Sequence, residues 1–486
     1  MAVSAKRNYV FNLLYTLSNL LFPLITFPYV TRILLPEGIG KVQFALNFAQ
    51  GIATIAAHGI PVYGMKEIAV AREKRSRLDA VFSELFWIQA ASILVMSALF
   101  LIIIWSAPAL RGDVEVLQIT FFLLIFAILN IDWLYKGLED FSFTSLRSIF
   151  IKAISVVLIL VFVKEQEDLL RFAAILTFGY AGNYLLNLTG LRRRVRLIFD
   201  FSRLQFKRHL PHLLYILNTI LVTTVYTYLD AVFLGLLTDK FEVGIYSVAV
   251  RLSKIGVPFV ITLAAVLLPR ISEASSQKNF REETRLLQTS LSFIFFMSCP
   301  IAVGLFLLRA EFILLFAGES FSQAALSLGA LSLLPVLIGL GNLFAFQILV
   351  PKNLNREMFI AAGSGLVAFF ISSIILMPRF GALGAAMSTL ITELIVTVLY
   401  FALLPGSIRG AFSWKPAYQA LISSMVFIPI TILVNLLIPN LIVAVATNIG
   451  LCAIFYIGLQ LLLFKNEFVK MGLTIVGNQI TKLKQR

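Results

Sequence analysis

Charged residues, cysteines and histidines are all scarce in this chain. Asp, Glu, Lys and Arg make up 13% of the 486 residues and hydrophobic residues 59%, whereas a soluble domain carries about 25% charged residues. Two cysteines exclude a disulfide framework, and the three histidines form no metal-binding pair. There is no Walker A motif, no nucleophile elbow and no carboxylate pair in a loop. We therefore expect neither an enzyme nor a bound cofactor.

Long hydrophobic runs, by contrast, are abundant. A helix needs about 20 apolar residues to cross a bilayer, and fourteen runs reach roughly that length. They span 8–31, 42–65, 81–107, 114–134, 145–163, 169–190, 213–237, 243–268, 286–308, 323–350, 357–377, 381–404, 416–438 and 441–464. The runs predict an all-α polytopic membrane protein with about fourteen transmembrane helices.

The basic residues indicate the orientation. Most of the 40 Lys and Arg residues fall on alternate connections, including both ends of the chain and the loops near 66–77 and 192–208. Because such residues stay in the cytoplasm, both termini are predicted to be cytoplasmic. The net charge of +15 then follows from topology and from attraction to anionic lipid headgroups. Membrane lipids are expected partners, and nucleic acid is not.

Two segments that begin at Leu13 and Leu213 resemble each other. Each has an apolar helix with scattered polar residues that ends in two leucines, then a short acidic loop, a glycine and a second helix. An even number of spans separates them, so the two halves share one orientation around an axis along the membrane normal, as in many transporters. We predict a six-helix N-lobe at 1–195, a six-helix C-lobe at 196–410, and two further helices with a basic tail at 411–486.

Of the basic residues, only Arg251 and Lys254 are expected well inside a span, where they share one helix face. Two cations at that depth are costly unless they line a watery cavity or meet anions. One interpretation is a cationic central cavity for a phosphate-bearing headgroup, because Arg binds phosphate oxygens in a bidentate manner. The other is a structural ion pair with Asp230, and the two can coexist.

The repeat also predicts residues that line the path of the headgroup. Aligning Gly40 with Gly244 places Asn47 opposite Arg251 and Gln50 opposite Lys254. Both halves would then present a polar pair at equivalent depth. Ahead of Asp230 lies a Thr- and Tyr-rich stretch, from which the cavity-lining candidates are Tyr226 and Tyr228.

Other polar residues in the spans have two interpretations each. Asp230 could neutralise Arg251 or bind a coupling ion, H⁺ or Na⁺. Glu393 could relay protons or make a local hydrogen bond. His58 could carry protons, although a hydrogen-bonded packing role is the more ordinary one. Arg32 could form the outer rim of the cavity or snorkel to the interface.

Four stretches, in this order, resemble the bacterial polysaccharide (O-antigen-type) flippases of the multidrug/oligosaccharidyl-lipid/polysaccharide superfamily. They are FPLITFPYVTRILLPEGIGKVQFA (22–45), DWLYKGLEDF (132–141), LLFAGESF (314–321) and RFGALGAAMSTLITE (379–393). The resemblance implies two six-helix lobes around a central cavity, as in multidrug antiporters and lipid II flippases. It implies translocation of an undecaprenyl-diphosphate-linked oligosaccharide, of O-antigen, capsule or exopolysaccharide type, to the outer leaflet of the bacterial inner membrane.

In such flippases a cationic cavity meets the pyrophosphate, a role that Arg251 and Lys254 match by position. A glycan polymerase and chain-length machinery would be natural partners. The first helix lacks arginine in its inner half, where peptidoglycan-precursor flippases carry some. This absence argues against a peptidoglycan precursor as the substrate. A lipid II flippase and a multidrug or cation antiporter are the alternatives to the polysaccharide flippase.

Overall fold

The computed structural model describes residues 5–214, 217, 224 and 228–470, and every regular element there is helical. The chain forms two compact units, Met1–Ser247 and Val248–Arg486, called here the first and second unit. This division falls later than the predicted lobe boundary at 195, because the helices that follow Asp230 pack against the first helix. The assignment of lobes stays a prediction.

Ten helices in the described part of the chain are long and apolar enough to cross a membrane. They are Arg75–Ser106, Pro108–Gly137, Phe141–Phe162, Gln166–Arg194, Lys240–Ala264, Phe280–Leu307, Ala324–Leu349, Asn355–Ala402, Lys415–Leu437 and Leu441–Leu462. The 48-residue helix Asn355–Ala402 joins two predicted spans across a kink at Gly381. Most of the predicted span 213–237 lies outside the described residues. The all-α membrane architecture is confirmed, and the count of fourteen is not.

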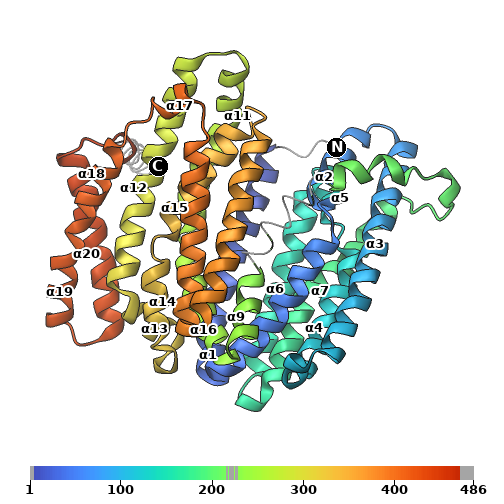
Figure 1. Ribbon diagram of the computed structural model, residues 1–486, viewed down its shortest axis with the longest axis horizontal. Coiled ribbons are helices and arrows are strands. Elements are labelled where there is room, and N and C mark those ends of the chain that lie inside the picture. Colours follow the sequence, from blue (N-terminus) through green and yellow to red (C-terminus); the bar gives the residue numbers. More distant parts are fainter. Residues whose placement is uncertain (1–4, 215–216, 218–223, 225–227, 471–486) are drawn as a thin grey trace, which may run out of the picture. The chain divides into compact units, whose positions relative to one another are not determined.

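The first unit contains α1 to α7, α9 and most of α10. Their bounds are α1 Ala5–Ala56, α2 Ile60–Ala71, α3 Arg75–Ser106, α4 Val114–Phe126, α5 Asp132–Gly137, α6 Phe141–Phe162, α7 Leu169–Arg194, α9 Asp230–Leu237 and α10 Lys240–Lys254. Short 3₁₀ turns are η1 Pro108–Asp113, η2 Ala127–Leu129, η3 Gln166–Asp168, η4 Phe201–Arg203 and η5 Phe206–Arg208. Within this unit α3, α4, α7 and α6 run side by side (Figure 1).

The second unit contains α11 to α20. Their bounds are α11 Val257–Ser276, α12 Phe280–Leu307, α13 Arg309–Ala317, α14 Ala324–Leu331, α15 Leu334–Asn342, α16 Asn355–Ala402, α17 Gly406–Arg409, α18 Lys415–Met425, α19 Phe427–Leu437 and α20 Leu441–Leu462. Between them lie the turn η7 Glu319–Phe321 and a π-helical stretch, η8 Leu343–Leu349. Helix α18 packs against α12, and α19 packs against α20, so the last two predicted spans lie beside α12.

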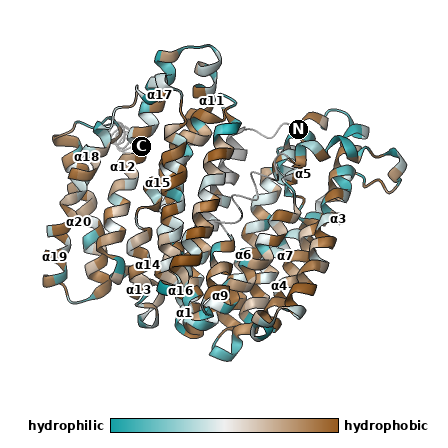
Figure 2. Ribbon diagram, in the orientation of Figure 1, coloured by the Kyte–Doolittle hydropathy of each residue, from teal (hydrophilic) through white to brown (hydrophobic). Residues whose placement is uncertain are grey.

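Hydrophobic side chains cover the outside of the helices as well as the core. Val95 and Ile102 on α3 are each 61% exposed, and Ile454 on α20 is 67% exposed. Figure 2 shows hydrophobic residues along the middle of the helices and hydrophilic residues toward their ends. An apolar exterior of this extent would favour aggregation in water, whereas lipid tails accept it without cost.

Two helices of the first unit break inside the bundle. Helix α1 ends at Ala56, and α2 begins at Ile60 after His58 (φ 47°) and Gly59 (φ 80°) adopt left-handed backbone conformations. Glycine tolerates that region and Pro61 then starts the new helix, where it needs no hydrogen-bond donor. The second break, at Asn130 and Ile131, separates η2 from α5.

The second break interrupts the α-helical hydrogen-bond ladder, and side chains from other helices add hydrogen bonds to the carbonyl oxygens there. The Nε2 atom of Gln89 lies 3.0 Å from the Ala127 oxygen and 3.3 Å from the Asn130 oxygen. Asn187 on α7 donates to the Leu129 oxygen at 2.8 Å, and Trp133 fixes Gln89 through a 3.2 Å hydrogen bond. Because lipid supplies no hydrogen bonds, such compensation lets a spanning helix break.

The repeated glycines meet each other. A Cβ atom on Gly40 would lie 1.6 Å from the Lys240 oxygen, and one on Gly244 would lie 1.9 Å from the Pro36 oxygen. The alignment of Gly40 with Gly244 also aligns Pro36 with Lys240, so the two contacts are equivalent under the internal duplication. Such a self-complementary crossing is what a twofold relation between the repeats predicts.

The crossing gives a first prediction. Gly40→Ala places a methyl group where the Lys240 carbonyl lies, so the two helices must separate. We expect a loss of at least about 3 kcal/mol in stability, at the upper end of single substitutions. Thermal unfolding of the purified protein in detergent measures the loss. The control is Gly363→Ala on α16, where the added methyl meets nothing within 4 Å. Equal melting temperatures for the two variants would contradict the proposed role of the crossing.

A partly buried ion pair anchors the end of α7 to the start of α6. Asp140 caps α6 by accepting from the Phe143 amide at 3.2 Å, and it also accepts from the Arg194 guanidinium. Burial would raise the pKa of Asp140, but the hydrogen bonds from Arg194 and Phe143 outweigh it and hold the pKa below its usual value. The pair therefore stabilises the fold above the unfolded-state pKa of about 3.9, and the contribution is lost as pH falls toward the folded-state pKa.

The variant Asp140→Asn tests this anchor. Asparagine caps a helix as well as aspartate does, so the substitution removes mainly the charge. We expect about 1–3 kcal/mol of destabilisation at pH 7, and a smaller difference from the wild type below about pH 4. Unfolding in detergent across this pH range measures both. The control Asp200→Asn removes an exposed ion pair with Arg203 and should change little. If the loss of stability in Asp140→Asn did not change with pH, the charge of the Asp140 carboxylate would not be its cause.

Candidate functional site

The two helix breaks of the first unit line one cavity of about 320 Å³. Its walls come from α1, α2, α3, α4 and α7 and from the segment before α9. The lining residues are Gln50, Ala53, Thr54, Ala57, Gly59, Pro61, Gln89, Ile93, Leu123, Ala127, Asn130, Tyr180, Tyr184 and Tyr228. Two of them, Gln50 and Tyr228, were predicted from the sequence to line the path of the headgroup.

The cavity wall is polar, and the described residues that line it include no Asp, Glu, Lys, Arg or His. Among the described residues, no hydrogen bond is formed by the side chains of five of its members: Gln50, Asn130, Tyr180, Tyr184 and Tyr228. Tyr180 and Tyr184 lie four residues apart on α7 and so share a face. The hydroxyl of Tyr184 lies within electrostatic range of Tyr180, Tyr228 and the Asp132 carboxylate. Amides and phenols with unused hydrogen-bonding capacity suit a neutral, hydroxyl-rich ligand.

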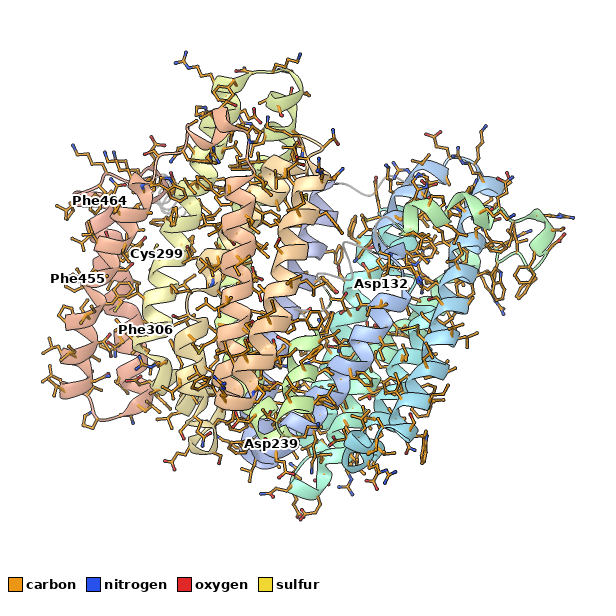
Figure 3. All side chains as sticks on the ribbon, in the orientation of Figure 1. Asp132, Asp239, Cys299, Phe306, Phe455 and Phe464 are labelled. Atoms are coloured by element: carbon orange, nitrogen blue, oxygen red, sulfur yellow. The ribbon has the colours of Figure 1, made fainter. Side chains whose placement is uncertain are left out.

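Helices α5, α6 and α7 share a charged network around Asp132, which is labelled in Figure 3. Arg147 on α6 donates to the Asp132 carboxylate at 2.9 Å and to the side-chain oxygen of Asn187. Asn187 donates to the same Asp132 oxygen at 3.1 Å, and Tyr135 donates to the Asn187 carbonyl. Asp132 therefore has a local structural partner. The charge of Arg147, which is only 7% exposed, is balanced by the Asp132 carboxylate.

The expectation that only Arg251 and Lys254 lie well inside a span is wrong. Lys152 lies in the middle of α6 and is half-buried. Its Nζ atom is 3.5 Å from the Ser18 hydroxyl and 5.3 Å from the centre of the Tyr15 ring on α1. The sequence held the signal, because Lys152 falls within the predicted span 145–163. The distribution of basic residues along the chain groups Lys152 with the neighbouring basic loop.

Arg251 and Lys254 are the last two basic residues of α10, and both are half-buried in the second unit. The helix ends at Lys254, and α11 begins at Val257. Cations at this end interact favourably with the helix dipole. The ammonium of Lys254 also acts electrostatically on Glu393 of α16, so the structure brings together two residues that the sequence analysis treated separately.

Asp230 is 3% exposed at the start of α9. Its carboxylate accepts a 2.7 Å hydrogen bond from the Tyr246 hydroxyl and another from the Ala231 amide. Tyr246 and Ala231 are two neutral partners of this acid, for which the sequence offered Arg251 or a coupling ion. The two earlier interpretations remain predictions.

The remaining predicted residues lie in different surroundings. His58 lies at the break after α1, with its Nδ1 atom 2.6 Å from the Ala56 oxygen and 3.0 Å from the Ser92 hydroxyl. Arg32 is exposed and donates to the Pro28 oxygen at 2.5 Å. Asn47 is half-buried on α1. Tyr226 lies outside the described residues.

Sequence reasoning missed much of the cavity wall: Tyr180, Tyr184, Asn130, Gln89 and Thr54. The spacing of Tyr180 and Tyr184 was a readable signal, because polar residues four apart in an apolar helix mark one face. The position of Gln89 against the broken α4 was not readable, because that contact joins residues far apart in the chain.

Two family models match the chain. The model described as polysaccharide biosynthesis protein matches residues 5–275, which is more than half of the chain, and the model described as MatE matches residues 216–349. A candidate O-antigen transporter of Escherichia coli (strain K12) is 24% identical over 82% of this chain and 96% of its own length. A second, from Shigella dysenteriae, is 22% identical over 81% of this chain and 98% of its own length.

Solved structures share the fold. The lipid II flippase MurJ in an inward closed conformation matches with a TM-score of 0.72 and 17% identity, over 93% of this chain and 98% of that one. An inward-facing multidrug resistance MATE family transporter of the MOP superfamily matches with a TM-score of 0.62 and 15% identity, over 80% and 93%. The multi-pass membrane fold and the family resemblance expected from the sequence are thereby confirmed. The chain belongs to the polysaccharide biosynthesis protein family.

Proposed function

We propose that this protein is a flippase that carries an undecaprenyl-diphosphate-linked oligosaccharide from the inner to the outer leaflet of the bacterial cytoplasmic membrane. Membership of the polysaccharide biosynthesis protein family is the observation that carries the proposal. The names of the relatives, candidate O-antigen transporters, agree with it. The MurJ-like fold is compatible with a lipid-linked substrate.

The physical problem is the headgroup, not the lipid tail. Each hydroxyl that leaves water without a new hydrogen bond costs about 2–7 kcal/mol, and a bare charge costs far more. A polar interior lined by amides, phenols and cations lowers this cost, while the apolar exterior of the helices suits the lipid tail. Exposing the interior first to one side and then to the other moves the headgroup across, which is alternating access.

Arg251 and Lys254 are proposed to bind the pyrophosphate, and Arg32 to assist at the outer rim. The guanidinium of Arg251 can form paired, charge-assisted hydrogen bonds to phosphate oxygens. The ammonium of Lys254 acts electrostatically on Glu393, which we propose as its counter-charge when no phosphate is bound. A lysine that exchanges a carboxylate for a phosphate avoids being left as an isolated buried charge.

Asn47, Gln50, Tyr226 and Tyr228 are proposed to contact the sugars. Asp230, Glu393 and His58 are the candidates for ion coupling, with H⁺ or Na⁺ as the ion and no organic cofactor. Both termini are proposed to be cytoplasmic, because of the distribution of basic residues. A glycan polymerase and chain-length machinery would act on the delivered product.

Charge reversal tests the phosphate role. A strain that lacks the gene should accumulate lipid-linked glycan on the inner leaflet and lose surface glycan. Wild-type protein should restore export. The double variant Arg251→Glu/Lys254→Glu should reduce export at least about 10-fold, because each charge-assisted hydrogen bond contributes about 1.5–3 kcal/mol. The fraction of glycan exposed to an impermeant glycosidase in spheroplasts measures the outcome.

The matched control is Lys207→Glu, which reverses an exposed cation of the first unit and should export normally. Immunoblots must show equal amounts of all three proteins in the membrane. Normal export by the double variant would refute the phosphate role. Normal surface glycan in the deletion strain, with altered resistance to cationic drugs, would instead favour the antiporter. Loss of peptidoglycan precursor transport would favour the lipid II flippase.

A further inference from the structure

We infer that the cavity of the first unit binds one uncharged sugar unit of the headgroup, and that Asn130, Tyr180 and Tyr184 determine which sugar is accepted. The inference deepens the proposed function and rests on it. It assigns a separate saccharide subsite to the first unit, with residues that the sequence did not single out.

The described residues of the cavity wall carry no charge, which favours a neutral ligand over an ionic one. An anion or a cation in a membrane-embedded pocket needs an opposite charge close by. None of the fourteen residues that line this cavity is acidic, basic or a histidine. A neutral ligand avoids this electrostatic cost, and a ligand that carries many hydroxyls can use the polar groups on offer.

The polar groups of the wall are available to a ligand. The Gln50 and Asn130 amides and the Tyr180, Tyr184 and Tyr228 hydroxyls make no hydrogen bond to the described residues. By contrast, the amide of Gln89 is already engaged by Trp133 and by the broken end of η2. Gln89 therefore shapes the cavity, whereas the other five side chains line it and form no side-chain hydrogen bond within the described part of the chain.

The aromatic content favours a sugar over a simple polar solute. Three tyrosines each supply an apolar ring face and a hydroxyl at its edge, which match the apolar C–H face and the hydroxyl rim of a pyranose. The apolar remainder of the wall, including Ile93 and Leu123, belongs to the same surface. This mixture of apolar walls and a few placed polar groups is typical of small-molecule sites.

The size of the cavity limits the ligand. At about 320 Å³ the cavity lies near the lower end of ligand pockets, which range over about 300–1,000 Å³. It therefore suits a single sugar and not a whole repeat unit. Residues at both helix breaks line it, among them Gly59 at the first break and Asn130 at the second.

The test uses full-length protein in proteoliposomes and two lipid probes. One is the undecaprenyl-diphosphate-linked glycan extracted from the deletion strain, and the other is undecaprenyl diphosphate without sugar. The variant Tyr180→Phe/Tyr184→Phe keeps both rings and removes both hydroxyls. We expect its KM for the glycan-linked probe to rise about 10-fold with little change in maximal rate. Transport of the sugar-free probe should match the wild type.

A second variant and a control separate binding from folding. Gln50→Ala removes an amide that makes no hydrogen bond within the described structure, so it should fold normally and also raise KM for the glycan probe alone. Tyr418→Phe changes a tyrosine that is 67% exposed on α18 and should behave as the wild type. Melting temperatures in detergent report any general loss of structure.

The outcomes distinguish the two proposals. If wild-type protein moves neither probe, the flippase function fails. If wild-type protein moves the glycan probe and both cavity variants show wild-type KM values for it, the saccharide subsite fails while the flippase function stands. If the cavity variants slow both probes equally, the cavity has a structural role only, which also overturns the inference.

Discussion

Hydrocarbon offers no hydrogen bonds, and the architecture follows from that constraint. Each backbone and side-chain polar group within the bundle must find its partner in the protein. Unbroken helices meet this demand locally, which is why the described chain is helical throughout its regular structure. Where α4 gives way to α5, Gln89 and Asn187 add hydrogen bonds from other helices. These bonds offset the cost of breaking a helix, and Asn130 at the break lines a polar cavity.

The internal duplication appears in the packing as well as in the sequence. Gly40 faces the Lys240 carbonyl as Gly244 faces that of Pro36, so equivalent residues make equivalent contacts. Backbones can approach this closely only where no side chain intervenes. The duplication does not extend to the chemistry, however. Asn47 and Gln50 in the first repeat are neutral, whereas Arg251 and Lys254 at the aligned positions are cations. A duplicated scaffold has therefore acquired two different polar surfaces.

The difference between the neutral polar residues of the first repeat and the cations of the second matches the chemistry of the proposed substrate. A lipid-linked glycan carries its charge at the diphosphate and its hydroxyls along the sugars. Half-buried cations on α10, one of which acts electrostatically on Glu393, suit the first part, because they gain from an anion that replaces solvent. The neutral cavity suits the second part, because amides and phenols can hydrogen-bond a sugar without attracting ions. Keeping charge out of the sugar cavity also avoids binding free phosphate there.

The sequence by itself determined the fold class and the family, and it placed Gln50 and Tyr228 among the residues predicted to line the path of the headgroup, a role that stays a prediction. Apolar runs, the bias of basic residues and the order of short motifs are local signals. They can be read from the sequence alone because every segment that crosses the lipid must form a long apolar helix. Tertiary structure alone decided which polar groups meet. Tyr246 reaches Asp230, Gln89 reaches the end of η2, and Lys152 lies against α1 and not in a loop. Such pairings join different helices, and they depend on helix rotation and on the exact positions of breaks, which hydropathy does not encode.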